Sequence, residues 1–112
     1  MESAHLLRGI LTKMRIISTK LLREFGASYV DARNPLAEWK RIARNAKWKT
    51  FDEVRLVFGK RVDRYKNLVI FDIGGNKYRL IAAIHYNTGI IYLRHMLTHA
   101  EYDQSKWKTD AK

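Results

Sequence analysis

The sequence contains no cysteine and only one proline among its 112 residues. A chain without cysteine has no disulfide scaffold, no thiolate zinc site and no cysteine nucleophile. No apolar run approaches the ~18 residues of a membrane-spanning helix, and the N-terminal segment lacks the apolar core of a signal peptide. We therefore expect a soluble cytoplasmic protein with no membrane association.

Acidic residues are the other scarce class. The chain has 22 Lys and Arg against 11 Asp and Glu, a formal net charge of +11. The excess is spread over both halves of the chain and is not confined to a tail. Such a charge attracts nucleic acid, an anionic membrane or an acidic protein.

The N-terminal half predicts a short strand followed by two helices. Residues 1–13 are interpreted as an extension of uncertain status, and residues 14–112 as one domain beginning with a strand at residues 14–17. The first helix is expected over residues 20–32 after a cap at Ser18 or Thr19. The second is expected to have Asn34 as its cap and Pro35 as its first helical residue. The second helix has a basic side, which is either a solvated face or a binding face, formed by Lys40, Arg41, Arg44 and Lys47.

Residues 48–68 are interpreted as an irregular linker that ends in a basic loop containing Lys60 and Lys66. Three strand-like runs follow at residues 69–73, 77–86 and 90–97, separated by glycine-containing turns. Two hairpins in series form an antiparallel meander. The expected fold class is α+β, with a small antiparallel sheet packed against two N-terminal helices.

Alternation along the strands predicts which side chains share a face. Two-residue turns would place Arg94 opposite Ile81 and Arg79 opposite Met96, so that both arginines lie on an open face. The same pairing places Asp72 opposite Lys77 on that open face. It assigns to the helix-facing side a set of Val69, Phe71, Ile73, Leu80, Ile84, Ile91, Leu93, His95 and Leu97.

A capping box at Thr98 and Glu101 predicts a short C-terminal helix beginning at His99. His99 and Tyr102 would then lie on one side of that helix, beside the two arginines. The four histidines show no zinc-type spacing, so no metal or other cofactor is expected. Arginine, histidine and tyrosine on an open sheet suit cleavage of RNA, which supplies its own 2′-hydroxyl nucleophile.

Three segments resemble the HigB-type toxins of type II toxin–antitoxin systems. They are residues 71–82 (FDIGGNKYRLIA), residues 92–94 (YLR) and residues 98–103 (THAEYD). The resemblance covers about residues 14–106, and the extension before Met14 is the main departure from the family pattern. It implies a RelE-like fold and a metal-independent mRNA endonuclease that acts on ribosome-bound message and so inhibits translation. It also implies neutralisation by a cognate helix-turn-helix antitoxin, which binds operator DNA with the toxin attached.

Under this interpretation the catalytic candidates are Arg79, Arg94, His99 and Tyr102, with the arginines on the scissile phosphate and His99 or Tyr102 in proton transfer. The candidate RNA contacts are Lys77, Tyr92, Lys106, Lys60 and Lys66. Two other interpretations remain open: a noncatalytic basic DNA- or RNA-binding module, and an interaction protein with an acidic partner.

Overall fold

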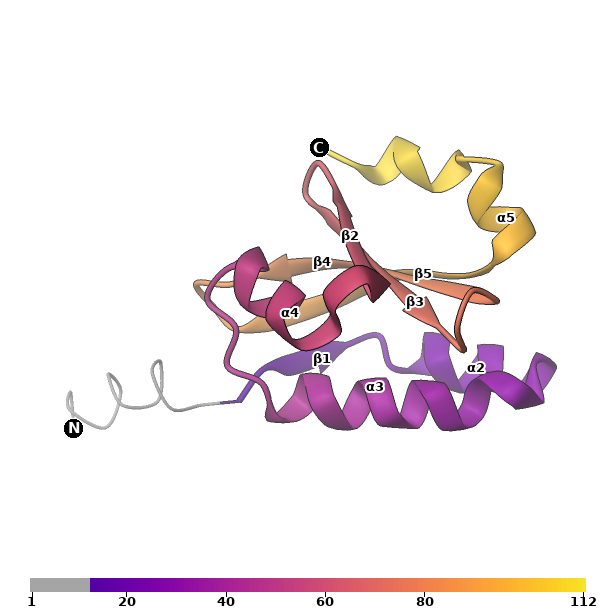
Figure 1. Cartoon of the computed structure of the whole chain (residues 1–112), viewed down its shortest axis with the longest axis horizontal. Coiled ribbons are helices and arrows are strands. Elements are labelled where there is room, and N and C mark those ends of the chain that lie inside the picture. The colour runs from indigo at the N-terminus through magenta and orange to yellow at the C-terminus, as the bar shows by residue number, and fades with distance from the viewer. Residues whose placement is uncertain (1–12) are drawn as a thin grey trace.

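The computed structural model describes residues 13–112 and confirms a mixed α+β fold around one five-stranded sheet (Figure 1). The strands are β1 (Arg15–Ile17), β2 (Val62–Tyr65), β3 (Leu68–Ile73), β4 (Tyr78–His85) and β5 (Ile90–Thr98). The helices are α2 (Lys20–Ser28), α3 (Arg33–Asn45), α4 (Phe51–Phe58) and α5 (His99–Asp103). Short 3-10 helices are η1 (Val30–Ala32), η2 (Gly59–Arg61) and η3 (Lys106–Asp110). The predicted extension at residues 1–13 lies outside the described residues, except for Lys13.

The sheet has the order β1-β5-β4-β3-β2. Helices α2, α3 and α4 cover one face, called here the helix face, whereas α5 and η3 lie over the other, called the second face (Figure 1). The predicted meander is confirmed as β3, β4 and β5. The predicted first strand is confirmed as β1, which pairs in parallel with β5.

The helix face holds the main hydrophobic core. Leu36 and Trp39 of α3 are buried, and the ring of Trp39 meets that of Phe71 edge-on, with 5.3 Å between centroids. Alternation in β4 sends Leu80 and its even-numbered neighbours into this core, as the sequence predicts. The strongly apolar side of α3 is therefore buried against the sheet.

The first helix is shorter than expected. It ends at Ser28, because Tyr29 leaves the helical conformation (φ −125°, ψ 89°), and η1 follows. The prediction of a side-chain cap is wrong, since Thr19 has helical φ and ψ and makes no capping hydrogen bond. The prediction of Asn34 as the cap of the second helix is also wrong, because α3 begins at Arg33 and Asn34 lies inside it. Pro35 lies within the first turn, where a missing N–H costs nothing.

The interpretation of residues 48–68 as an irregular linker is wrong. This segment contains α4, η2 and the edge strand β2. A capping box starts α4: Glu53 N donates to Thr50 Oγ1 (3.3 Å), and Thr50 N donates to Glu53 Oε1 (3.2 Å). Val54 and Phe58 then enter the core of the helix face.

The first hairpin differs from its predicted register. Its turn has four residues, so Ile73 pairs with Tyr78, and Asp72 lies opposite Arg79 and not opposite Lys77. Because the shift is an even number of residues, every side chain of β3 keeps its predicted face.

The second hairpin follows the predicted register as far as Ala82, which pairs with Leu93. A β-bulge then adds Arg94 to β5, so Ile81 pairs with His95 and Arg79 pairs with Leu97. The predicted opposition of Arg94 to Ile81 and of Arg79 to Met96 is therefore wrong. His95 and Leu97 lie on the second face and not among the helix-facing set, while Met96 enters the core of the helix face.

Candidate active site

The second face is not open as predicted. Its buried cluster consists of Leu68, Ile70, Ile81, Ala83 and Trp107. Trp107 belongs to η3, so the C-terminal segment closes part of this face.

Arg79 lies at the margin of this cluster and is 7% exposed, the one buried charged residue among residues 13–112. Its Nε lies 3.2 Å from Asp72 Oδ1 on the adjacent strand. Nη1 donates to the carbonyl oxygens of Asn76 (3.2 Å) and Tyr78 (3.1 Å), and Nη2 donates to Asn76 Oδ1 (2.5 Å). Three hydrogen bonds and one ion pair therefore hold the guanidinium in place.

Tyr102 covers the guanidinium of Arg79. The Arg79 Cζ atom lies 5.2 Å from the centroid of the Tyr102 ring, a cation–π arrangement. The other contact of the ring is with Trp107, which stacks nearly parallel at 5.1 Å and whose Nε1 donates to the carbonyl oxygen of Tyr102 (3.0 Å). Arg79, Tyr102 and Trp107 therefore form one connected stack.

His99 begins α5, and the predicted capping box at Thr98 and Glu101 is confirmed. The backbone N–H of His99 donates to the carbonyl oxygen of Lys77 (2.9 Å), which fixes the start of the helix against the β3–β4 turn. Its ring Nδ1 lies 3.0 Å from Asp103 Oδ2, one turn further along α5. Within residues 13–112, the other ring nitrogen has no hydrogen-bond or ion-pair partner.

Electrostatics connect these residues. Burial raises the pKa of Asp72, while the positive charges of Arg79 and His99 act in the opposite direction. Burial also raises the pKa of Tyr102, with Arg79 again opposing. Electrostatic interactions therefore link the side chains of Asp72, Arg79, His99 and Tyr102. Because its pKa is raised, the phenol of Tyr102 keeps its proton at neutral pH.

Arg94 does not join this group. As the extra residue of the bulge, it lies beside His95, and both side chains approach the carboxylate of Asp110 in η3. The Arg94 Nη2 to Asp110 Oδ2 distance is 3.9 Å. No contact joins Arg94 to Arg79 within residues 13–112, so the two predicted phosphate ligands lie at separate points of the second face.

The candidate RNA contacts are dispersed. Tyr92 pairs with Ala83 and its ring meets that of His85 at 4.8 Å, on the side of the face away from Arg79. Lys77 forms an ion pair with Asp31 of η1 (2.8 Å), whose other oxygen accepts from the Tyr78 hydroxyl at 2.5 Å. This places Lys77 beside the helices and not on the second face.

Three lysines remain on the surface. Lys60 lies in η2, Lys66 in the β2–β3 turn and Lys106 at the start of η3, all exposed. Lys66 and Lys108 lie against the ring of Tyr65, with their Nζ atoms 5.5 and 5.0 Å from its centroid.

Sequence reasoning missed three residues that shape the site: Asn76, Trp107 and Asp110. Asn76 was assigned only to a turn, and its side chain holds Arg79. Trp107 and Asp110 follow the last predicted helix, where no periodic pattern marks them. An apolar tryptophan in a basic tail was the available signal that this tail packs on the domain.

Metal clusters and membrane-spanning helices are both absent from residues 13–112. Residues 13–112 contain no group of three or more His, Asp or Glu side chains arranged to hold a metal ion. Over the same residues, no helix has the length and apolarity needed to cross a bilayer.

The site therefore contains the buried guanidinium of Arg79, the imidazole of His99 held by a carboxylate, and the protonated phenol of Tyr102. Exposed lysine and arginine side chains lie around them. Such a set stabilises a phosphate and transfers protons.

The sequence is similar to those of known proteins. The HigB_toxin family model, described as the RelE-like toxic component of a toxin-antitoxin system, matches residues 32–105. The mRNA interferase toxin HigB of Escherichia coli (strain K12) is 27% identical over 93 residues, which cover 80% of this chain and 88% of the relative. The mRNA interferase HigB of Escherichia coli O6:H1 (strain CFT073) is 30% identical over 94 residues, covering 81% of this chain and 90% of the relative.

Proposed function

Because the chain belongs to the HigB family of RelE-like toxins, we propose that it is an endoribonuclease that cuts ribosome-bound mRNA without a metal ion. The curated relatives are named mRNA interferases, which supports the RNA substrate. The observation that carries the mechanism is the grouping of Arg79, His99 and Tyr102 around Asp72 on the second face of the sheet.

The reaction is an internal transesterification. The ribose 2′-oxygen forms a bond to phosphorus while the bond from phosphorus to the 5′-oxygen breaks. A base takes the proton of the 2′-hydroxyl and an acid gives one to the leaving 5′-oxygen. The products are a 2′,3′-cyclic phosphate and a 5′-hydroxyl, so neither a water molecule nor a redox partner is consumed.

His99 is the proposed base. Asp103 holds Nδ1 at 3.0 Å, which orients the ring and supports the positive charge that forms when the other nitrogen accepts a proton. The His99 side chain is partly exposed and therefore reachable by RNA.

Tyr102 is the proposed acid. Burial raises its pKa, so the phenol is protonated at neutral pH and has a proton to give. Three positions separate it from His99 on α5, which puts both side chains on neighbouring positions of one helix face.

Arg79 acts mainly as a fixed positive charge. Its contacts with Asp72 and Asn76 hold it in place, and its positive charge would stabilise the negative charge that develops on the phosphate. This role differs from the two-arginine clamp expected from the sequence, because Arg94 lies beside Asp110.

The flanking RNA is proposed to follow the exposed cations. Arg94 and Lys106 would contact phosphates near η3, Lys60 and Lys66 would contact them near β2, and Tyr92 would stack on a base. Lys77 serves this purpose only when it leaves Asp31, so its contribution is the smallest of the set.

The family also has an antitoxin partner. We propose a cognate helix-turn-helix antitoxin, contact with operator DNA only through that antitoxin, and action in the cytoplasm, where ribosomes are. Residues 14–112 are proposed to form a single RelE-like toxin domain, and residues 1–13 an N-terminal extension of it.

The decisive experiment incubates the purified full chain with translating ribosomes and maps new 5′ ends on the message. We expect sequence-dependent cuts that carry 5′-hydroxyl groups. The same cuts should appear on a minimal free RNA in excess EDTA if no metal takes part. Strict dependence of cleavage on added Zn²⁺ or Mn²⁺ would contradict the metal-free mechanism.

Two substitutions test the assigned residues. His99→Ala and Tyr102→Phe should each lower the rate by roughly 10²–10⁴-fold, as expected for loss of a general base or acid. Tyr86→Phe is the matched control, because it removes a hydroxyl from the helix face and should leave the rate unchanged. RNA binding without any cuts by the unsubstituted protein would indicate the noncatalytic module instead.

A further inference from the structure

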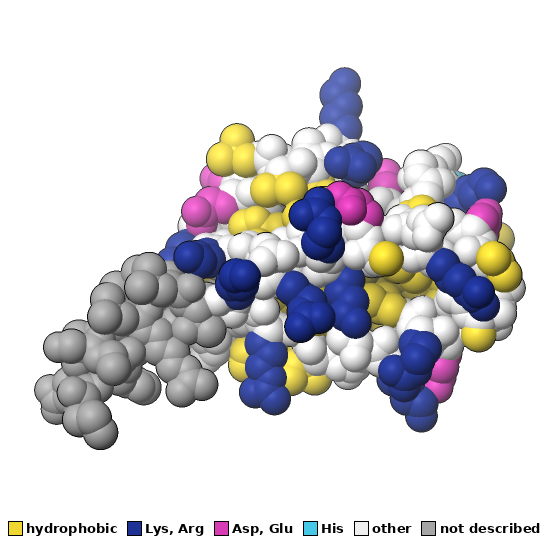
Figure 2. All heavy atoms as spheres, turned by 90° about the horizontal axis from the view of Figure 1, so that it is seen from below, with side chains coloured by type: hydrophobic (Ala, Val, Ile, Leu, Met, Phe, Trp, Pro, Cys, Tyr) yellow, Lys and Arg dark blue, Asp and Glu magenta, His cyan; other side chains and the backbone are white. Residues whose placement is uncertain are grey.

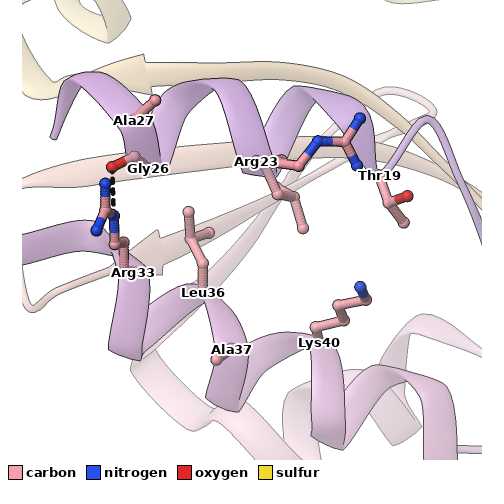
Figure 3. A pocket seen from close by; sticks show the side chains of 9 residues that line it. Thr19, Arg23, Gly26, Ala27, Arg33, Leu36, Ala37 and Lys40 are labelled. Atoms are coloured by element: carbon pink, nitrogen blue, oxygen red, sulfur yellow. Dashed lines mark hydrogen bonds between the residues drawn. The ribbon is translucent and has the colours of Figure 1, made fainter. Parts of the chain in front are cut away.

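The outer surface of the helix layer carries a groove between α2 and α3. It has a volume of about 480 Å³ and is open to solvent. Its walls come from the turns of the two helices that face each other, as Figure 3 shows for Gly26 and Ala27 of α2 and Leu36 and Ala37 of α3. The sheet separates this groove from Arg79 and Tyr102, so it is no part of the candidate active site.

The floor of the groove is apolar and composed of small or buried groups. Leu22 and Leu36 are buried at its base, whereas Ala27 and Ala37 are exposed on its walls. One end is closed by Arg33, whose Nε donates to the carbonyl oxygen of Gly26 (2.8 Å; Figure 3). A Cβ at residue 26 would lie 3.1 Å from Cγ of Arg33, so glycine there permits this close approach.

The rim of the groove is cationic. Arg23 lies on the α2 side and Lys40 on the α3 side, and the ammonium group of Lys40 points toward α2 (Figure 3). Within residues 13–112, neither Arg23 nor Lys40 has a carboxylate within salt-bridge distance. The carboxylates nearest in sequence are used elsewhere, since Glu24 pairs with Lys20 and Glu38 pairs with Arg41.

The positive rim extends beyond the groove itself. Two neighbouring hollows share Lys40 and add Arg44, and one of them reaches Arg15 of β1. Figure 2 shows this face from outside, with Lys and Arg side chains surrounding patches of exposed apolar surface. Cationic side chains without carboxylate partners surround an apolar floor. A complementary ligand would be apolar on one side and acidic at its edges.

We propose that this groove binds an acidic amphipathic segment of the antitoxin, with its apolar side chains against Leu22 and Leu36 and its carboxylates against Arg23 and Lys40. The inference rests on the antitoxin partner given under Proposed function. RNA is the less suitable occupant, because phosphates and ribose gain nothing from a floor of leucine and alanine. The groove geometry suits a helix, which repeats an apolar side chain every three or four residues.

The experiment titrates full-length cognate antitoxin into the full chain and three variants by calorimetry. Ala37→Trp fills the groove from an exposed helix position, and Lys40→Glu reverses one rim charge. Lys47→Glu is the matched control, because it makes the same change in net charge at an exposed site that lines none of these hollows. Circular dichroism and thermal unfolding establish that each variant folds.

We expect Ala37→Trp and Lys40→Glu each to weaken antitoxin binding at least tenfold, with Lys47→Glu within about twofold of the unsubstituted protein. The Lys40→Glu effect should shrink as salt rises, because screening removes the charge contribution, whereas the Ala37→Trp effect should persist. Unchanged affinity in both groove variants would overturn the proposal. So would loss of RNA cleavage with unchanged antitoxin affinity, which would make the groove an RNA surface.

The two proposals fail separately. If the unsubstituted protein cuts no RNA but the groove variants bind antitoxin more weakly, the groove proposal is supported. Only the nuclease mechanism is then overturned. Normal cleavage by variants that bind antitoxin normally overturns only the groove.

Discussion

The two faces of the sheet are built from the same strands but are covered differently. On the helix face, three helices cover a continuous apolar core in which Phe71, Leu80 and Ile91 are fully buried. On the second face, a smaller apolar cluster is covered by α5 and η3 alone, and Arg79 is buried at its edge.

With the proposed site on the second face, the domain would keep stability and chemistry on separate faces. Alternation gives each strand two independent sets of side chains, so one set can be apolar throughout while the other carries charge. A charge such as Arg79 is tolerated because Asp72 and the Asn76 and Tyr78 carbonyl groups surround it. Four substitutions test this division, taken in order of their expected effect on the free energy of unfolding.

Phe71→Ala on the helix face should have the largest effect. Removing a fully buried phenylalanine costs about 3–5 kcal/mol through lost burial and the cavity left behind. Urea denaturation should show the loss, while any protein that remains folded should still cut RNA. A small loss of stability would mean that α3 and the sheet collapse onto the cavity.

Arg79→Ala should affect both stability and chemistry. It leaves Asp72 without its partner, which should destabilise the fold by roughly 1–3 kcal/mol, towards the lower end because Asp72 is partly exposed. Loss of the fixed charge should lower the cleavage rate by about 10²–10³-fold.

The double variant Arg79→Ala/Asp72→Ala separates these two roles. With no unpaired carboxylate left, it should recover part of the stability and none of the activity. Recovery of activity would show that Arg79 only neutralises Asp72. The burial of Arg79 is the reason that its loss is expected to lower stability as well as the cleavage rate.

Trp107→Ala should act locally on the second face. The side chain stacks on Tyr102 and covers the apolar cluster, so its loss should loosen η3 with little change in the helix face. We expect faster amide exchange in residues 106–112 and a roughly 10- to 100-fold lower cleavage rate, because Tyr102 loses its support. Trp107→Phe, which keeps a stacking ring, should restore most of the rate.

Tyr78→Phe should have the smallest effect at neutral pH. The hydrogen bond to Asp31 raises the pKa of Tyr78 to about 12, from 10.0 in an unfolded chain. The stability linked to this proton is complete below pH 10 and is lost as the pH rises from 10 to 12. Unfolding midpoints should fall over that range in the unsubstituted protein and fall less in Tyr78→Phe.

The sequence predicted the meander because its signals are local. Glycine-containing turns and alternating strands identified β3, β4 and β5, and face assignments were correct wherever the register error was an even number of residues. The capping box at Thr98 placed α5 correctly for the same reason.

Features that depend on distant contacts were missed. The bulge at Arg94 arises because His95 and Leu97 pack on the second face while Met96 packs on the helix face, and no local pattern encodes that choice. Helix α4 is different: Thr50 and Glu53 form the same capping box that marked α5, so its signal was present and was overlooked.

For the candidate site, the sequence correctly predicted that three of the four catalytic candidates lie close together. The predicted start of α5 gave the positions of His99 and Tyr102, and alternation along β4 gave the face on which Arg79 lies. Arg94 was misplaced by the bulge. Burial of Arg79 escaped prediction because it depends on the side chain of Asn76 in the turn and on the ring of Tyr102, and no local pattern places either against Arg79.

The parallel pairing of β1 with β5 has a consequence for how the chain folds during its synthesis. Arg15 pairs with Ile90, so the first strand to be synthesised has no neighbour until the last strand has been made. Closing such a distant contact slows folding, because the entropy of the intervening loop is lost before the pairing stabilises it. The nascent chain therefore remains incomplete through most of its own translation. The strand that completes the sheet leads directly into His99 and Tyr102, so assembly of the fold and assembly of the reactive group are one late event.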